Sequence, residues 1–223
     1  MLSILIPTLN EERALPDCLR RVREVAPAAE IIVSDGGSSD RTLSLAAPYA
    51  RVVEGPSGRG RQLNRAAAHA RGERLLFLHA DTLLPWLNVE EEIARGMERP
   101  GILGGNFRIQ FFPTDPAVRF LERMYNAARP IGLFFGDSAM FVRREPFLAR
   151  GGFHREDLME DVELARWMRR AGRTFRIEQP VRTSSRRFRG SAFRHVALWL
   201  SLYSLFYCGV PDRALARFYP AVR

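Results

Sequence analysis

Lysine is absent from this sequence of 223 residues, so all 34 of its basic residues are arginine, and the formal net charge is +9. Arginine binds phosphate and carboxylate groups through a planar fork of donors. A basic surface of this kind suits nucleic acid, anionic lipid or a diphosphate substrate. A solvated, arginine-rich face explains most of these residues more simply, so the charge by itself selects no function.

Cysteine is almost as scarce. Cys18 and Cys208 lie far apart and form neither a CxxC pair nor a metal-ligand pattern. Their number and spacing argue against a disulfide framework and fit a reducing compartment. The short apolar run at residues 1–10 has no basic segment before it and no small-residue cleavage site after it. We therefore expect no cleavable signal peptide.

Several common catalytic motifs are also missing. The sequence contains no GxGxxG fingerprint, Walker motif, HExxH zinc motif or GxSxG elbow. These absences argue against a dinucleotide site, a P-loop, a zinc peptidase and an α/β-hydrolase. No internal repeat, low-complexity segment or linker is visible, and 46% hydrophobic with 26% charged residues is an ordinary globular composition. We expect one domain over residues 1–223.

What the first half does contain is an alternation of strand and helix patterns. Segments with helical spacing separate apolar runs that are typical of strands, at residues 2–6, 31–33, 52–53 and 74–78. This repeat predicts right-handed crossovers and an α/β fold with a mainly parallel sheet. In such sheets the ligand lies beyond the carboxyl ends of the strands. Polar clusters follow three of the runs there, at residues 8–11, 35–40 and 79–81.

The second half has a different pattern of apolar and polar residues. Phe107, Ile109 and Phe111 alternate with polar residues, which indicates a half-buried strand. Residues 115–129 have a helical pattern. Residues 160–171 form a second predicted helix, because apolar residues recur at helical spacing and a glycine follows the last of them.

Two of the polar clusters place a carboxylate at a strand end. Asp35 opens a loop of glycine and serine, where it is suited to accept hydrogen bonds from a base or a ribose, although a turn with a helix cap explains the same residues. Asp81 ends a hydrophobic strand. Magnesium is commonly held by one or two carboxylates plus substrate phosphates, so Asp81 is a candidate metal ligand, with a turn-capping aspartate as the alternative.

Two further segments carry charged groups at the start of a predicted helix. Glu160 and Asp161 open the helix at 160–171, where the helix dipole alone favours acidic residues. The functional interpretation is that one carboxylate is a general base for an attacking hydroxyl. The glycine-rich turn at 57–62 precedes another helix, and its backbone amides and arginines, Arg61 among them, are suited to phosphate.

In order and spacing, these motifs resemble the family 2 glycosyltransferases of the GT-A fold, over roughly residues 1–172. The likeness rests on residues 3–12, 33–42, 77–82, 151–153 and 159–164, and residues 135–138 with the tail resemble a compact bacterial subgroup. The resemblance implies a Rossmann-like, mainly parallel sheet flanked by helices. It further implies a nucleotide-sugar-binding half at 1–110, an acceptor half at 111–190 and a helical C-terminal tail at 191–223.

The resemblance also implies an activity: a hexosyltransferase-like enzyme that moves a sugar from a nucleotide-diphosphate sugar to an unidentified hydroxyl acceptor, with inversion of the anomeric centre. The implied donor is a UDP-sugar, with a GDP-sugar as the alternative. The implied cofactor is Mn²⁺ or Mg²⁺, and nucleic acid is not a partner. Asp161 is the implied base, with Glu160 beside it.

The remaining implied site residues fall into three groups. Asp81 is the implied metal ligand, and Gly136 and Asp137 are implied on the acceptor side. The implied donor-nucleotide residues are Pro7, Thr8, Asn10, Glu11, Asp35, Gly36, Gly37, Ser38, Arg61 and Ala80.

One position departs from the family pattern. His79 stands where the DXD metal motif has its first acidic residue. In related enzymes the final aspartate makes the main metal contact, so Asp81 can suffice. His79 is then a metal ligand, a ribose contact or a packing residue. His195 lies where some relatives supply a further metal ligand from the tail.

The tail leaves its own alternatives open. Residues 196–210 contain no charged residue but are too few to cross a bilayer, which takes about 20 apolar residues. Arginines precede this run, so it either rests on an anionic membrane surface or packs against the core or a second subunit of a homodimer. The packed arrangement is the preferred one. We expect a cytoplasmic protein, with peripheral attachment to the inner membrane face as the alternative.

Other functions stay open from the sequence alone. A catalytically impaired nucleotide-binding module is motivated by His79, and a nucleotidyltransferase would release pyrophosphate instead of a nucleoside diphosphate. A nucleic-acid-binding protein is motivated only by the charge and lacks a reader motif. A group of aromatic residues fits an acceptor groove and core packing equally well: Phe107, Phe111, Phe112, Phe134 and Phe135.

Overall fold

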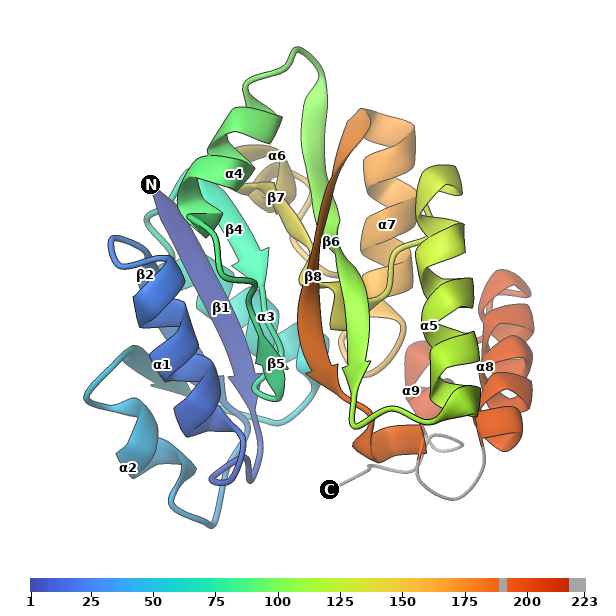
Figure 1. Cartoon of the computed structure of the whole chain (residues 1–223), viewed down its shortest axis with the longest axis horizontal. Coiled ribbons are helices and arrows are strands. Elements are labelled where there is room, and N and C mark those ends of the chain that lie inside the picture. The colour runs from blue at the N-terminus through green and yellow to red at the C-terminus, as the bar shows by residue number, and fades with distance from the viewer. Residues whose placement is uncertain (189–191, 217–223) are drawn as a thin grey trace.

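The computed structural model describes residues 1–188 and 192–216, apart from the side chains at 187 and 192–195. In this part of the chain an eight-stranded sheet has the order β3-β2-β1-β4-β7-β6-β8-β5 (Figure 1). Its strands are β1 Leu2–Thr8, β2 Glu30–Asp35, β3 Arg51–Glu54, β4 Arg74–Phe77, β5 Thr82–Leu83, β6 Ile102–Phe112, β7 Phe141–Arg143 and β8 Arg173–Ser184.

The strand directions confirm the predicted, mainly parallel sheet. β1 pairs in parallel with β2 and β4, β2 with β3, and β6 with β8. The antiparallel strand β7 lies between β4 and β6 and so connects the two halves of the sheet, and β5 runs antiparallel to β8 at the edge. The carboxyl ends of β1, β2 and β4 therefore meet at one edge.

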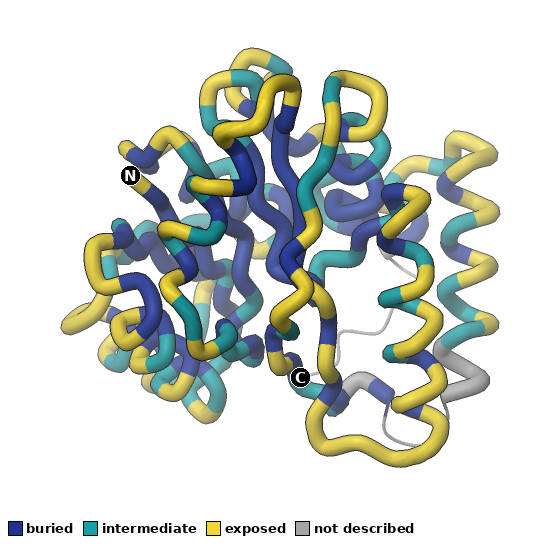
Figure 2. The backbone as a smooth tube through the Cα atoms, turned by 45° about the horizontal axis from the view of Figure 1, so that its top comes forward, coloured by how far each residue is buried: buried dark blue, intermediate teal, exposed yellow. Residues whose placement is uncertain are grey.

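Helices cover both faces of this sheet. The α-helices are α1 Leu15–Val25, α2 Thr42–Ala46, α3 Arg59–His69, α4 Val89–Met97, α5 Pro116–Ala128, α6 Arg144–Ala149, α7 Glu160–Ala171, α8 Ala192–Tyr207 and α9 Asp212–Ala216, and the short 3-10 helices are η1 Arg129–Ile131, η2 Gly136–Ser138 and η3 Arg186–Phe188. Because successive strand residues point to opposite faces, Ile4 and Ile6 pack with α1 and α4, whereas Leu5 packs with α3 and α7. Figure 2 shows the central strands as the most deeply buried part of the chain.

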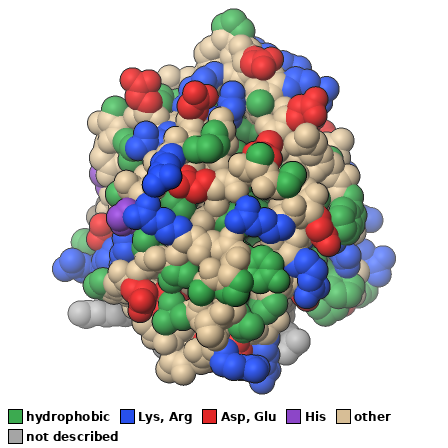
Figure 3. Space-filling view, turned by 90° about the vertical axis from the view of Figure 1, so that its left-hand side faces the viewer, with side chains coloured by type: hydrophobic (Ala, Val, Ile, Leu, Met, Phe, Trp, Pro, Cys, Tyr) green, Lys and Arg blue, Asp and Glu red, His purple; other side chains and the backbone are tan. Residues whose placement is uncertain are grey.

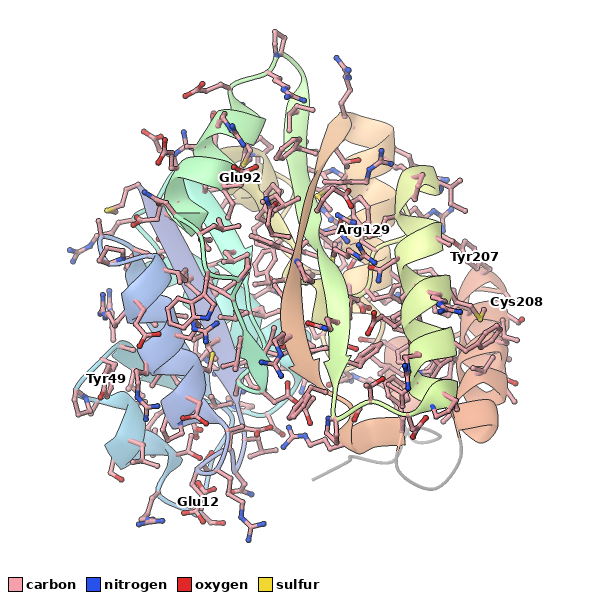
Figure 4. All side chains as sticks on the ribbon, in the orientation of Figure 1. Glu12, Tyr49, Glu92, Arg129, Tyr207 and Cys208 are labelled. Atoms are coloured by element: carbon pink, nitrogen blue, oxygen red, sulfur yellow. The ribbon has the colours of Figure 1, made fainter. Side chains whose placement is uncertain are left out.

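The buried side chain of Arg129 connects the two long strands β6 and β8. The register of the two strands shifts between Phe107 and Arg108, which leaves Glu178 in the irregular part of β8. Arg129 donates to the backbone carbonyl of Ile177 at 2.8 Å and pairs with Glu178 at 3.2 Å. Figure 4 shows Arg129 between α5 and this strand pair. The contact lies where α5 ends and the chain turns through η1 toward η2.

The tail packs against the start of α7. Leu202 and Phe206 of α8 are buried with Met159 and Val162. The opposite side of α8 is exposed, as the teal and yellow helix at the right-hand edge of Figure 2 shows. Among the helices that the structure describes, none is both long and apolar enough to cross a membrane.

Candidate active site

The loops after β1 and β2 are bound together at the carboxyl edge of the sheet. The backbone amide of Asn10 donates to the Ser38 hydroxyl at 2.8 Å, and the Asn10 side chain accepts from the Ser39 amide at 2.8 Å. The Glu11 amide donates to the Thr42 hydroxyl at 2.8 Å. These contacts fix the relative position of two segments that were predicted to bind the donor nucleotide.

Asp35 is the centre of this network. Its side chain lies in a residue with 0% exposure, and one carboxylate oxygen accepts from the amides of Gly37 and Ser38 at 2.8 and 2.7 Å. The other oxygen accepts from the hydroxyls of Thr8 and Ser38. The hydrogen bonds of Thr8 and Asp35 therefore stabilise the loop after β2, independently of any contact with a nucleotide.

Helix α3 supplies site residues that the motif analysis did not select. Gln62 is buried and donates to the carbonyls of Thr8 and Ser34 at 2.7 and 2.8 Å, which ties the ends of β1 and β2 together. Arg65 donates to the carbonyl of Asp35 at 3.3 Å. Arg59, Gln62 and Arg65 follow one another at intervals of three residues, and this spacing on one side of a helix was a signal available in the sequence.

Asp81 lies against an arginine from the far end of the chain. Arg186 of η3 places its Nε 3.1 Å from Asp81 Oδ2, and its Nη2 donates to Glu11 Oε1. One guanidinium thus bridges the carboxylates of the first and third polar clusters. A cleft of about 410 Å³ adjoins this bridge and is also lined by Arg182 and Thr183.

The side chains around Asp81 suit a divalent cation only if oxygen atoms of a substrate complete its coordination. No cluster of three or more His, Cys, Asp or Glu side chains suited to a metal occurs among the described residues. Asp81 and Glu11 nevertheless share one cation, the Arg186 guanidinium. Burial, followed by the charges of Asp81 and Glu11, raises the pKa of the neighbouring Cys18 thiol, which keeps it protonated and a poor ligand. The fit is therefore to a cation held by one or two carboxylates plus phosphate oxygens.

His79 faces the acceptor-side loop. Its Nδ1 lies 3.2 Å from Asp137 Oδ1, and both side chains are largely buried. A Cβ atom at Gly136 would stand 3.2 Å from both Asp161 Oδ2 and His79 Nε2, so any side chain there would crowd both groups. The structure thus brings His79, Gly136, Asp137 and Asp161 together.

Asp161 and Glu160 are both buried at the start of α7, with 6% and 2% exposure. Asp161 Oδ2 accepts from the Gly136 amide at 2.7 Å, and Oδ1 accepts from the Val162 amide at 2.8 Å. Glu160 pairs directly with Arg59, whose Nη2 lies 4.0 Å from Asp161. Burial raises the pKa of Glu160, the Arg59 charge opposes that rise, and the Asp161 charge adds to it.

Arg61, in contrast, is engaged away from the strand ends. Its guanidinium pairs with Glu156 at 3.1 Å and with Asp157 at 2.6 Å. Its predicted role toward the nucleotide stays a prediction, and Arg59 is the arginine of that turn that reaches the candidate base. Among the described residues, three other than glycine have a positive φ: Asn10 is itself a predicted site residue, Met159 precedes Glu160, and Ala139 lies two residues after Asp137. Strained backbone of this kind clusters at functional sites.

Apart from Arg61, the predicted site residues that the structure describes are thus brought to one edge of the sheet, in two groups. The donor group consists of the loops after β1 and β2, with Pro7, Gly36 and Gly37 in them, and of Ala80 and Asp81 after β4. The acceptor group consists of His79, Gly136, Asp137, Glu160 and Asp161. His195 was predicted as a further metal ligand, and its side chain lies outside the described residues.

Comparisons with known proteins identify the family of this chain. The model of the family Glycosyl transferase family 2 matches residues 3–150. The PGL/p-HBAD biosynthesis glycosyltransferase of Mycobacterium bovis is 38% identical over 93 residues, which cover 38% of this chain and 36% of that protein. The undecaprenyl-phosphate 4-deoxy-4-formamido-L-arabinose transferase of Pseudomonas aeruginosa is 32% identical over 112 residues, 44% of this chain and 32% of that protein. The chain thus spans about a third of the length of the curated relatives it matches.

A solved structure shows the same fold. Glucosyl-3-phosphoglycerate synthase from Mycobacterium tuberculosis, in complex with Mn²⁺, uridine-diphosphate and glucosyl-3-phosphoglycerate, superposes with a TM-score of 0.65 at 22% identity, over 95% of this chain and 81% of that one. The GT-A type fold implied by the sequence motifs is therefore confirmed. Since the family match covers 148 residues of the 223, from residue 3 to residue 150, this chain belongs to glycosyl transferase family 2.

Proposed function

We propose that this glycosyltransferase is a metal-dependent, inverting enzyme that transfers a sugar from a UDP-sugar to an acceptor hydroxyl, with Asp161 as general base. The observation that carries the proposal is the position of Asp161. Its carboxylate is buried, is oriented by the amides of Gly136 and Val162, and lies beside His79, two residues before Asp81. The candidate base and the candidate metal ligand thus meet at the edge where donor ligands bind.

The reaction needs one base and one stabilised leaving group. Asp161 accepts the proton of the acceptor hydroxyl as the oxygen attacks the anomeric carbon, and the bond from that carbon to the diphosphate oxygen breaks. Attack opposite the leaving group inverts the anomeric centre. General-base assistance of this kind contributes about 10²- to 10⁴-fold to the rate. The orienting amides keep the carboxylate in place without adding a charge of their own.

Asp81 and Glu11 would hold the divalent cation together with the donor diphosphate. The cation supplies Lewis-acid stabilisation of the negative charge on the departing nucleoside diphosphate. Arg182 and Arg186 line the adjoining cleft, where guanidinium groups are suited to phosphate. The UDP and Mn²⁺ held by the mycobacterial synthase of the same fold support this choice of donor and metal, with a GDP-sugar as the alternative.

The first experiment is a thermal-shift panel of UDP, GDP, CDP and TDP, each with and without Mn²⁺, on the wild type, on Asp81→Ala and on Glu98→Ala. Glu98 is an exposed carboxylate at the end of α4, far from the site, and serves as the matched control. We expect UDP to stabilise the wild type and Glu98→Ala only with Mn²⁺, and Asp81→Ala to lose the shift. A metal-independent shift would contradict the metal role of Asp81.

Turnover separates the enzyme from a module that only binds nucleotides. Asp161→Asn should bind UDP as the wild type does but lose sugar transfer by about 10²-fold or more. Binding without transfer or hydrolysis by the wild type, over a wide set of acceptors, would indicate the impaired module, and release of pyrophosphate would indicate a nucleotidyltransferase.

A further inference from the structure

An apolar cavity adjoins the acceptor side of the candidate active site. It has a volume of about 270 Å³ and lies between α5, the loop after η1, η3 and α8. None of the described residues that line it is charged, and its walls include Tyr125, Ala128, Phe135, Val196, Trp199 and Tyr203. Buried apolar walls favour an apolar ligand, because polar groups that enter lose their hydrogen bonds to water.

The inner wall of this cavity is formed by Phe135 and Tyr203, which lie near the candidate base. Phe135 lines the cavity and is followed by Gly136, whose amide donates to Asp161 at 2.7 Å. The Phe135 ring stacks on Tyr125 with centroids 4.1 Å apart and lies 6.4 Å from the Tyr203 ring. Burial, followed by the charge of Asp161, raises the pKa of Tyr203, so its phenol stays neutral beside the carboxylate.

The outer end opens on the surface between α5 and α8. Met124 and Leu200 line the cavity and are 45% and 64% exposed. Phe120, one turn earlier on α5, is 60% exposed. Apolar walls therefore extend from the surface to Phe135, the residue before Gly136.

The size of the cavity limits what it holds. A dry apolar cavity of about 150 Å³ is large enough to bind benzene. A volume of about 270 Å³ therefore takes an aromatic ring with a substituent, or several methylene groups of a chain. A longer chain would extend past Met124 and Leu200 to the surface.

We propose that this cavity is the acceptor subsite, and that the acceptor is an amphiphile whose hydroxyl group meets Asp161 while its alkyl or prenyl chain lies in the cavity. The proposal rests on the proposed function only for the step at Asp161. The cavity wall includes Phe135, whose neighbour Gly136 contacts Asp161, and this proximity favours the acceptor as the occupant, since an acceptor hydroxyl has to reach Asp161 from one side or another.

The test uses the full-length protein and a series of n-alkanols, from hexanol to decanol, as probes in calorimetric titrations. Each buried methylene should tighten binding about fourfold until the cavity is filled. Two variants narrow the cavity from opposite walls, Ala128→Phe on α5 and Val196→Phe on α8. Their controls introduce phenylalanine one residue away, at exposed positions: Ala127→Phe and Ala197→Phe.

We expect both narrowing variants to weaken octanol binding at least tenfold, and both controls to stay within twofold of the wild type. Affinity that does not depend on chain length, or narrowing variants that bind as the wild type does, would overturn the proposal. So would a dimer in solution that octanol dissociates, because the occupant would then be a second copy of this chain. Vesicles of anionic phospholipid that bind the wild type and both narrowing variants equally, with no alkanol binding, would instead indicate a membrane-facing surface.

A second measurement separates this proposal from the proposed function. With the nucleotide sugar and Mn²⁺ present, mass spectrometry should detect the alkyl glycoside. Ala128→Phe should lower its yield, whereas the exposed control Ala127→Phe should leave both this yield and donor hydrolysis by water unchanged. Chain-length-dependent binding without any donor turnover would refute the proposed function and leave the cavity's ligand class intact. Donor hydrolysis without alkanol binding would refute the amphiphilic acceptor alone.

Discussion

At the scale of single residues, three arginines around the candidate site each bridge two carboxylates. Arg59 lies against Glu160 and Asp161, Arg61 against Glu156 and Asp157, and Arg186 against Glu11 and Asp81. A planar guanidinium can present donors to two carboxylates at once, which the single ammonium group of lysine does less well. The arginine-only composition of the chain thus has a structural use at this edge of the sheet.

Removing the arginine beside the base should cost stability. Arg59→Met leaves Glu160, which is only 2% exposed, as a buried charge without its partner, and such a loss costs about 3 kcal/mol. The double variant Arg59→Met with Glu160→Met should recover part of that loss, since no unpaired charge at position 160 is left. Urea unfolding of the wild type, Arg59→Met, Glu160→Met and the double variant measures the loss of stability and its recovery. Equal stabilities for Arg59→Met and the wild type would mean that the pair contributes nothing.

Arg186 should compete with a divalent cation for Asp81. Because the guanidinium and the metal need the same carboxylates, Arg186→Ala should raise the affinity for Mn²⁺ without donor by about fivefold, the value of a half-exposed ion pair worth about 1 kcal/mol. Electron paramagnetic resonance of free Mn²⁺ measures this affinity. Arg182→Ala removes a charge from the same cleft without touching Asp81 and is the control. Lower affinity in Arg186→Ala would show that Arg186 assists the site instead.

Residues of this kind differ in how far the sequence predicts them. Asp81 and Asp161 could be selected because they stand at a strand end and at a helix start, where local patterns are readable. Arg186 could not, because its contact with Glu11 joins residues 175 positions apart and depends on where β8 ends and η3 begins. His79 shows the same limit: its Nδ1 faces Asp137, a contact that only the packing of the second half determines.

At the scale of elements, local signals predicted two helices of the second half but not one long strand, and α4 and α6 were not predicted either. The helix expected at 160–171 is observed as α7 with both ends unchanged, and the helix expected at 115–129 is observed as α5. β8 was not predicted, although it has 12 residues, because charged residues and Pro180 interrupt its apolar pattern. Its pairing with β6 supplies the backbone bonds that its own sequence does not indicate.

Besides its apolar contacts with α7, the tail is joined to the loop before α7 by the carboxylate of Asp212. Asp212, at the start of α9, accepts from the amides of Glu156 and Asp157 at 2.8 and 3.1 Å. Burial by itself raises the pKa of Asp212, but the donating amides of Asp157, Glu156 and Arg213 together lower it below its ordinary value of 3.8. A carboxylate with a lowered pKa contributes stability above its unfolded-state pKa, and the contribution is lost as pH falls through the lowered value.

We therefore expect the contact between α9 and residues 156–157 to open in acid before the sheet unfolds. Amide exchange at Glu156 and Asp157 should accelerate as the pH is lowered below about 3.8, relative to the intrinsic exchange rate at each pH. Asp212→Asn should show the faster exchange already at neutral pH, with little further dependence on acid. Exchange that is equally slow in the variant would mean that other contacts hold the segment.

At the scale of the whole molecule, the net charge of +9 does not form a single basic face on the side that Figure 3 shows, where arginines alternate with acidic and apolar side chains. The sheet, in contrast, is continuous through both halves of the chain. β4 of the first half pairs with β7 of the second, and buried clusters combine the two, as Leu76 with Phe141 and Phe77 with Phe147. The lack of a linker in the sequence predicted one domain, and this shared core supports the same prediction more strongly.

A fragment of residues 1–110 should therefore fail to fold alone. It would expose Leu75, Leu76 and Phe77, whose neighbours lie on β7 and α6, and it would leave β6 without either of its partner strands. We expect broad amide signals and weak protection from exchange in the isolated fragment. Adding residues 111–223 in trans should restore native-like spectra, because the missing strands and apolar surface return together.

The full chain provides the complementary measurement. Trp86 reports on the first half, and Trp167 and Trp199 report on the second, so tryptophan fluorescence of single-tryptophan variants can follow each half separately in urea. If the sheet is one cooperative unit, both fluorescence signals and the far-ultraviolet circular dichroism should change at the same midpoint. A first half that unfolds at its own midpoint, or a folded 1–110 fragment, would show two units. In that case the contacts between His79, Gly136 and Asp161 would form an interface between units, and donor and acceptor sites could open without unfolding.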